Sequence, residues 1–323
     1  MRRSFLVFLL GLGSLLTADS LFYTEIQGVV GYSSPDQRTI YRSGQMDDAM
    51  QLNSLGFDYL QKFSGGRGDI GSAALQARLA YRADQKKTEA QIYNAYWKSK
   101  TSLGDVWFGH NRVAFGLAAY WDTHADLLQP LPMHGFGYDR DWGIGWSKDT
   151  LDGGYQAALT SGSGLPLRTD GNWLATGRIA RGALGYDNYS VGLSLLTGQT
   201  PEIMGYTVMD TRLKKLALIN LDAAYNYDNL EHKAEIALGR REQDDTLAVF
   251  YRCGLNLGEE NRLKLEGQYV YTSVYTHART TDNTWLGIGA LYRLTAELTS
   301  RLMYEWQRAL DEYKIVAQLY AYF

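Results

Sequence analysis

The chain has 323 residues, of which 45% are hydrophobic and 21% charged, and its formal net charge is −3. This slightly negative charge, without any basic block, argues against a nucleic-acid-binding protein, and a single cysteine, Cys253, excludes an intrachain disulfide framework. With 24 tyrosines, 34 glycines and only 5 prolines, and with few helix-type runs, the composition favours an all-β protein.

The first 20 residues contain the three parts of a secretory signal peptide in the usual order. Two arginines follow Met1, an apolar stretch occupies residues 5–16, and Ala18-Asp19-Ser20 forms a small-x-small cleavage site. The apolar stretch is too short to span a membrane. We therefore expect residues 1–20 to be a signal peptide and Leu21 to begin the mature chain, since the alternative of a buried core helix does not explain the order of the parts.

From residue 21 onward, apolar and polar residues alternate as they do in β-strands, and helical periodicity is almost absent. In 246–257, for example, Leu247 and Val249 lie on one face and Arg252 on the other. The alternation predicts about sixteen strands. They lie near 22–32, 49–63, 71–83, 88–98, 102–110, 141–148, 153–161, 172–185, 189–197, 213–227, 232–241, 246–257, 260–276, 284–295, 299–308 and 312–323.

The connections between these strands differ in length at the two ends of the sheet. If the first strand leaves the periplasm, every connection at the periplasmic end is a short turn, as near 186–188 and 257–261. All the long connections lie at the other end: 33–48, 111–140, 162–171, 198–212 and 277–283. This segregation and an even strand number are typical of a bacterial outer-membrane β-barrel, and a soluble sandwich gives no reason for it.

The last predicted strand carries apolar residues at alternate positions. Ile315, Ala317, Leu319, Ala321 and Phe323 share one face. A closed barrel pairs its last strand with its first because lipid cannot satisfy an open sheet edge. The strand resembles the terminal strand of bacterial outer-membrane proteins, which ends in Phe and is the signal read by the barrel assembly machinery. The resemblance implies this role for Phe323, Ala321 and Leu319, although Ala321 is smaller than the residue usual in that family.

Residues 111–140 break the strand pattern. A loop of this length in a compact fold is either functional or disordered, and Trp121, Leu128 and Phe136 make this one too apolar for disorder. Its place after the fifth strand resembles that of the third loop in general sixteen-stranded porins, which folds into the barrel and narrows the pore. The resemblance implies an all-β transmembrane antiparallel barrel over residues 21–323, with 111–140 as a constriction loop in the lumen.

In porins an acidic loop faces basic wall residues across the constriction, and the resemblance implies the same arrangement here. The expected constriction residues are Asp122, Asp126, Asp139, Asp141, Arg78, Arg82, Arg112 and Arg140. Strand alternation places further charges on the lumen face. These are Arg178, Arg241, Arg252, Lys264, Arg293, Arg301, Glu235, Glu266 and Glu305. The alternative is that the charges only hydrate the lumen.

The function expected from these features is passive diffusion of small hydrophilic solutes or ions, without catalysis, a cofactor or a metal ion. The surroundings would be outer-membrane lipids and lipopolysaccharide, and a monomer and a homotrimer both stay open. One alternative is a barrel hydrolase, because Asp122/His124 and Asp139/Asp141 resemble the pairs of outer-membrane aspartyl-type proteases. Those proteases, however, have ten strands and carry the pairs on opposite walls. Another alternative is a structural barrel that binds a partner protein.

Overall fold

The computed structural model describes residues 17–35, 37–40, 51–66, 68–82, 86–204, 207–276 and 279–323. In these residues one antiparallel sheet contains sixteen long strands and one three-residue strand, β2 (Arg38–Ile40). The predicted sixteen-stranded antiparallel barrel is therefore confirmed. The long strands are β1 (Thr17–Ser33), β3 (Asn53–Gly65), β4 (Gly68–Arg82), β5 (Lys87–Thr101), β6 (Gly104–Arg112), β7 (Arg140–Thr150), β8 (Gly153–Thr160), β9 (Trp173–Arg181), β10 (Tyr189–Met204), β11 (Thr207–Tyr227), β12 (Leu230–Arg241), β13 (Asp244–Leu257), β14 (Leu263–Tyr275), β15 (Thr280–Arg293), β16 (Leu298–Gln307) and β17 (Glu312–Tyr322).

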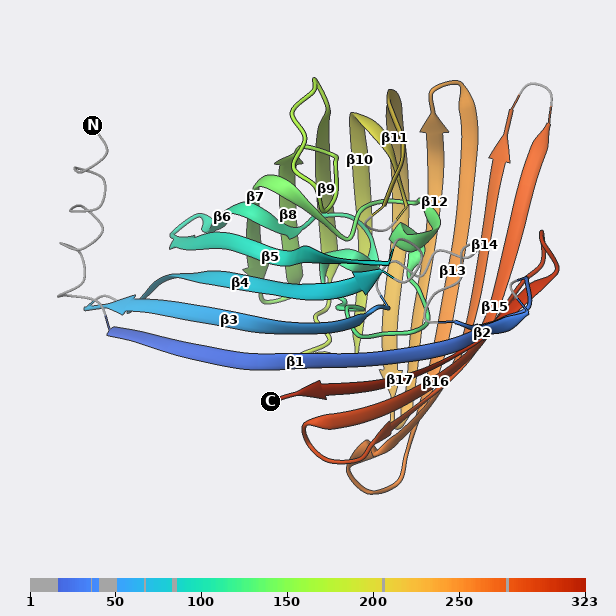
Figure 1. Ribbon diagram of the computed structural model, residues 1–323. Helices are drawn as coiled ribbons and strands as arrows, with labels where there is room; N and C mark the ends of the chain where they lie inside the picture. The colour runs from blue at the N-terminus through green and yellow to red at the C-terminus, as the bar shows by residue number, and fades with distance from the viewer. Residues whose placement is uncertain are drawn as a thin grey trace.

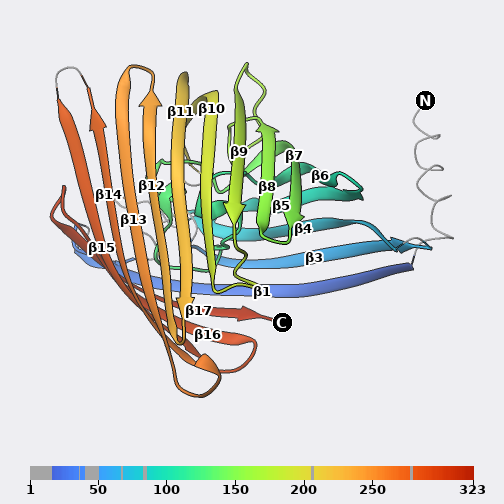
Figure 2. The same ribbon diagram turned by 180° about the vertical axis from the view of Figure 1, so that it is seen from behind.

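The sheet closes because β1 pairs with β3 on one side and with β17 on the other. Glu25 lies opposite Tyr322, and Ser33 lies opposite Lys314. At the end of this seam Thr24 and Phe323 exchange two backbone hydrogen bonds, of 2.6 and 3.1 Å. Figures 1 and 2 show the resulting ring, in which the red β17 runs beside the blue β1. Closure satisfies the strand edges that lipid would leave without partners.

The two faces of the sheet have opposite characters. Outward side chains are large and apolar, as shown by Leu221 and Ile236, which are 53% and 43% exposed. Inward side chains on the same strands are polar or charged, and Asp222 and Glu235 are 0% and 4% exposed. An apolar exterior around a polar interior is the reverse of a soluble protein and matches a barrel surrounded by lipid. No helix in the described part of the chain is long and apolar enough to span a membrane.

Some predicted boundaries are wrong. The predicted loop 198–212 is largely a hairpin, because β10 runs to Met204 and pairs with β11 as far as Thr207. The hairpin mixes Pro201, Glu202 and Asp210 with the apolar Ile203 and Val208, so the ladder continues where regular apolar alternation has ended. The predicted strand 172–185 stops at Arg181, where Gly182 takes a positive φ of 76°. The predicted loop 33–48 includes β2, and its residues 41–48 fall outside the described residues, as do residues 1–16 of the predicted signal peptide.

Candidate functional site

The longest connection, residues 113–139, joins β6 to β7 and contains two short 3-10 helices, η1 (Leu117–Ala119) and η2 (Leu131–His134). Its first turn approaches the wall closely. The backbone N–H of Gly116 donates to Ser194 Oγ of β10 at 3.1 Å, and that of Leu117 donates to Glu235 Oε1 of β12 at 3.3 Å. Gly116 has a φ of 60°, and a Cβ there would lie 1.8 Å from Glu235 Oε1, so this approach requires glycine.

The second half of the segment is hydrogen-bonded to β13 and β14. Arg252 donates through Nη1 to Asp126 Oδ2 at 2.9 Å and through Nη2 to the carbonyl of Leu128 at 2.7 Å. Gln268 donates to the carbonyl of Gln129 at 2.9 Å. Arg252 is 2% exposed, so these bonds replace its contact with water. Side chains of the wall thus donate to main-chain carbonyls of the segment as well as to the carboxylate of Asp126.

Apolar contacts bind the segment to the same side of the barrel. Three of its four clusters in the described residues join it to inward-facing side chains there, and the fourth joins Met133 to Tyr93 of β5. The first contains Val113, Phe115, Tyr138, Leu174, Leu196, Ile203, Leu216 and Leu218, the second Leu117, Leu131, Phe136, Ala237, Ala248, Phe250 and Val270, and the third Leu127, Leu128 and Met303. Strands β9 to β16 therefore bury apolar surface on their inward faces wherever this segment lies against them.

The carboxylate of Asp122 lies between two arginines at the ends of the segment. Arg112 Nη2 is 2.5 Å from Oδ2, and Arg140 Nη2 is 3.3 Å from Oδ1. Partial burial raises the pKa of Asp122, but the guanidinium groups of Arg140 and Arg112 outweigh it and hold that pKa below its usual range. Arg140 also pairs with Asp139. The structure therefore brings four of the predicted constriction residues into one group: Asp122, Asp139, Arg112 and Arg140.

Asp141 has a different environment from the other predicted acids. Its buried carboxylate accepts hydrogen bonds from the backbone N–H groups of Gly162, Ser163 and Gly164 and from the hydroxyl of Ser161 at 2.8 Å. These contacts fix the start of the connection between β8 and β9. Asp141 therefore orders a neighbouring loop and is not brought to Asp122.

The two arginines predicted on β4 have partners on neighbouring strands. Arg78 donates to Gln27 at 2.8 Å and to Gln91 at 2.9 Å, and its guanidinium lies 4.7 Å from the centre of the Tyr93 ring. Arg82 lies 3.7 Å from Glu89.

The predicted lumen charges form pairs along the inward faces of the strands. Arg293 differs from the other predicted lumen charges, because its side chain is exposed at the end of β15. The pairs are Arg178–Asp222 at 2.7 Å, Arg241–Glu202 at 3.3 Å, Lys264–Glu266 at 3.1 Å, Arg301–Gln318 at 2.8 Å, Glu235–Asn220 at 2.8 Å and Glu305–Lys314 at 3.3 Å.

One contact of the segment was missed by sequence reasoning. His124 Nε2 lies 2.6 Å from Glu25 Oε2 of β1, and both side chains are buried. Asp122 accepts a hydrogen bond from the backbone N–H of His124 at 3.0 Å, so it does not orient the ring as the hydrolase alternative required. The available signal was a glutamate among the alternating residues of β1, but nothing in the sequence pairs it with a residue 99 positions away.

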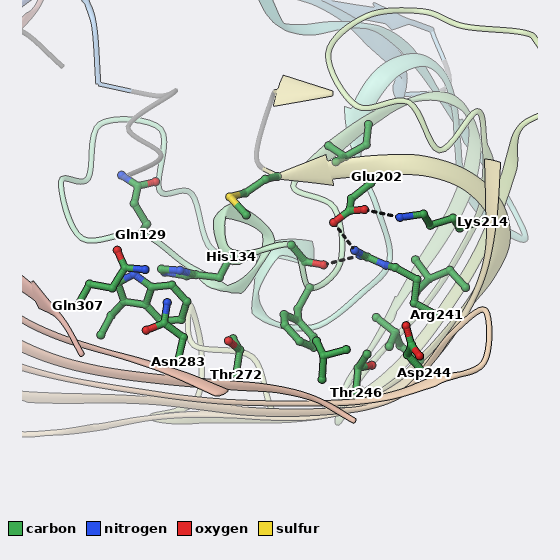
Figure 3. Close-up of a pocket in the computed structure, with 18 of the residues that line it drawn as sticks. Gln129, His134, Glu202, Lys214, Arg241, Asp244, Thr246, Thr272, Asn283 and Gln307 are labelled. Atoms are coloured by element: carbon green, nitrogen blue, oxygen red, sulfur yellow. Dashed lines mark hydrogen bonds and ion pairs between the residues drawn. The ribbon is translucent and has the colours of Figure 1, made fainter. Parts of the chain in front are cut away.

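Cavities lie on both sides of the segment. Three of about 370, 380 and 340 Å³ all have Asp122 in their lining. A fourth, of about 400 Å³, lies against Gln129, His134 and Phe136 on the side of the long loops. Figure 3 shows residues that line this outer cavity, among them Gln129 and His134 of the segment and Asn283 and Gln307 of the wall strands. The half-exposed carboxylate of Asp122 thus borders hydrated space from several directions.

A closed barrel of sixteen strands, apolar outside and charged inside, defines a porin-like outer-membrane β-barrel. Solved porins and channels share this fold. An anion-selective porin from Comamonas acidovorans is 13% identical with a TM-score of 0.65, and covers 95% of this chain and 100% of its own. OmpF from Salmonella typhi in complex with daunomycin is 11% identical with a TM-score of 0.67, covering 94% of this chain and 97% of its own.

The outer-membrane channel DcaP of Acinetobacter baumannii is 12% identical to the chain, with a TM-score of 0.64, and covers 95% of this chain and 97% of its own. No family model matches the sequence, and no curated protein matches it. At such identities the likeness defines the fold, which points to the bacterial outer membrane. The identity of the solute must therefore be inferred from the geometry of the site.

Proposed function

We propose that the protein is a channel for passive diffusion of small hydrophilic solutes or ions, and that residues 111–140 fold into its lumen as a constriction loop. The observation that carries the proposal is the set of wall contacts of this segment. It is bonded to Ser194, Glu235, Arg252 and Gln268 and, on the opposite side of the seam, to Glu25. These residues belong to β10, β12, β13 and β14 and, across the seam, to β1, and all of them face inward.

The proposed constriction has an electric field of its own. Asp122 borders three cavities and keeps its negative charge because Arg112 and Arg140 lower its pKa. Arg78 lies on β4, and its guanidinium and that of Arg140 lie 4.7 and 5.9 Å from the centre of the same Tyr93 ring. Charges at the narrowest point of a pore determine which ions pass. The group formed by Asp122, Arg112 and Arg140, together with Arg78 and Arg82, is therefore proposed to set the ion preference.

The proposal assigns no chemical step to the protein. The contact that resembles a catalytic pair, Glu25–His124, attaches the segment to β1, and a nucleophile beside it would be needed for covalent hydrolysis. Outer-membrane lipids and lipopolysaccharide would surround the barrel. The barrel assembly machinery would read its terminal strand through Phe323, Ala321 and Leu319. The proposal fits a monomer and a homotrimer equally.

Conductance in planar bilayers under a salt gradient tests the proposal. Asp122→Asn should shift the reversal potential towards anions more than Asp126→Asn, because Asp126 is less exposed and paired with buried Arg252. Arg78→Gln with Arg82→Gln should shift it towards cations. Deleting residues 124–133 should raise conductance. Asp282→Asn, an exposed position on β15, is the control and should change neither quantity. A barrel that does not conduct contradicts the channel, and a conducting barrel that none of these changes affects contradicts the constriction.

A further inference from the structure

The cavity of about 340 Å³ that borders Asp122 extends from the long segment to the short turn between β15 and β16. Its charges are unequal. The described lining residues carry one arginine, Arg301, against the carboxylates of Asp58, Asp122, Asp126 and Glu297. An excess of negative charge on the walls of a cleft raises the local concentration of cations and lowers that of anions. The cavity therefore favours a positively charged solute.

Asp58 of β3 differs from the acids that the long segment contributes to this cavity. Asp122 and Asp126 have arginine partners, whereas the carboxylate of Asp58 accepts a hydrogen bond from the hydroxyl of Tyr322 at 3.1 Å. No lysine or arginine in the described residues forms an ion pair with Asp58. The residue is partly exposed, so its charge is available to a solute in the cavity.

Two amide side chains continue the row from Asp58 along the wall. Gln76 of β4 lies directly opposite Asp58, and Asn94 of β5 lies directly opposite Gln76. Arg140 can only donate, and its Nε donates to Asn94 Oδ1 at 3.1 Å. The Asn94 Nδ2 therefore faces Gln76 and donates to its Oε1 at 2.7 Å. This chain of bonds leaves the amide nitrogen of Gln76 as the donor at the Asp58 end of the row.

The amide nitrogen of Gln76 has no acceptor in the described part of the chain, although the residue is only 6% exposed. It is not one of the enclosed polar atoms that lack both a partner and access to solvent. Nε2 is thus open to the cavity that Gln76 lines. Directly opposite residues have Cβ atoms about 4.5–5.5 Å apart. A carboxylate without a cation and a donor without an acceptor therefore lie within reach of one small molecule.

We propose that this cavity binds the amino end of an amino-acid amide or short peptide, with the ammonium group on Asp58 and the adjacent carbonyl oxygen on Nε2 of Gln76. The two groups sit on neighbouring carbon atoms in every α-amino amide, which suits a carboxylate and a donor on directly opposite residues. A primary ammonium group has three donors and meets further negative charge from Asp122. The inference rests on the proposed channel for the route by which the solute arrives.

Calorimetric titration of the purified full-length barrel at pH 7, where an α-amino group is largely protonated, tests the site with three probes. Alaninamide has the ammonium group and the carbonyl, propylamine has only the ammonium group, and N-acetylalaninamide has only carbonyls. Alaninamide should bind more tightly than either of the others. Asp58→Asn keeps an acceptor for Tyr322 but removes the charge, and it should weaken alaninamide binding about 10- to 100-fold.

Gln76→Met removes Nε2 and keeps the length of the side chain, while water can bond to the partly exposed Asn94. It should weaken alaninamide about 3- to 10-fold, as expected for one lost hydrogen bond, and leave propylamine unchanged. Asp69→Asn is the matched control. Asp69 is an exposed carboxylate at the start of β4 that is paired with Lys100 and does not line this cavity, so its loss should leave alaninamide binding unchanged.

The outcomes separate the site from the channel. This pattern of binding supports the site whether or not the barrel conducts. A conducting barrel that does not bind alaninamide overturns the site and leaves the channel standing. Propylamine binding as tightly as alaninamide, or N-acetylalaninamide binding as tightly, overturns the pairing of an ammonium group with a carbonyl. Equal weakening in Asp58→Asn and Asp69→Asn also overturns the site, because the loss then follows from the general negative charge of the barrel.

Discussion

Arg252→Leu should release the long segment from the wall without unfolding the barrel. The arginine is bonded to Asp126 and to the carbonyl of Leu128, and its guanidinium lies 4.4 Å from the centre of the Trp121 ring. Leucine fills part of the same volume but offers none of these contacts. The backbone ladders that join β13 to β12 and β14 do not involve the side chain. Arg252 also donates through Nε to Gln268 of β14 at 2.8 Å, so the perturbation falls on the docking of the segment and on one side-chain contact within the wall.

The magnitude follows from the contacts. Removing one partner of a buried ion pair costs about 3–5 kcal/mol, since the other charge is left uncompensated. The lower end applies here because the side chain of Asp126 is 25% exposed, and water can solvate it. With a docking free energy lower by about 3 kcal/mol, the undocked population should rise about 100-fold, at 1.4 kcal/mol for each factor of ten.

Thiol labelling measures this population. Ala118 in η1 is buried, so Ala118→Cys in a Cys253→Ser background should react with a maleimide only when the segment is undocked. Adding Arg252→Leu should accelerate the reaction about 100-fold, while the folded barrel keeps its heat-modifiable mobility in gel electrophoresis. Arg301→Leu is the matched control. It also removes one inward positive charge, but its hydrogen bond at 2.8 Å is to Gln318 of β17, so labelling should not accelerate.

Two results would refute this reasoning. Equal labelling rates with and without Arg252→Leu would mean that the apolar clusters alone hold the segment. Loss of the folded barrel in Arg252→Leu but not in Arg301→Leu would mean that the arginine stabilises the wall itself.

Three further predictions concern the wall, pH and orientation. Ile236→Arg, in the middle of β12 on the outward face, should cost about 2–4 kcal/mol of barrel stability in urea titrations, whereas Leu255→Arg, near the end of β13, should cost about 0–1 kcal/mol. Burial lowers the pKa of His134 to about 3, so the ring is neutral while the segment is docked. In the undocked segment the same ring binds a proton below about pH 6.5. Docking should therefore weaken as pH falls from 6.5 by up to about 1.4 kcal/mol per unit, and the resulting rise in conductance between pH 6.5 and 4.5 should be smaller in His134→Gln. In a Cys253→Ser background, Thr169→Cys should be labelled by an impermeant reagent on intact cells and Asp187→Cys should not; the reverse pattern would invert the proposed orientation.

The wall could be predicted from the sequence because two solvents act on it. Lipid selects apolar residues outside and water selects polar ones inside, so most positions of β12 and β13 alternate, apart from inward residues such as Phe250 that pack on the long segment. The alternation fails where that condition fails. Residues 216–219 are apolar throughout, because Leu216 and Leu218 face inward onto the long segment while Ile219 faces lipid. At its far end the ladder of β10 and β11 continues to Met204, where Ile203 and Val208 pair and pack inward rather than towards lipid.

The site was predictable to the extent that it is local. Arg112 and Arg140 lie directly opposite each other on β6 and β7, so the ends of the segment bring them near Asp122. The contacts across the barrel were not predictable. Arg252 reaches Asp126 over 126 positions, and Glu25 reaches His124 over 99. Each of these depends on which part of the wall the segment lies against, and no local pattern in a single sequence contains that information.

The same docking gives different roles to two acids that the sequence treats alike. Asp126 is bonded to the buried guanidinium of Arg252, so much of its charge acts on the wall and holds the segment. Asp122 is half exposed and borders three cavities. Both acids have arginine partners that weaken their fields, so the difference between them is exposure: the side chain of Asp122 is 50% exposed and that of Asp126 25%. We therefore expect Asp122 to be the acid that acts on solutes and Asp126 to be the acid that holds the segment in position.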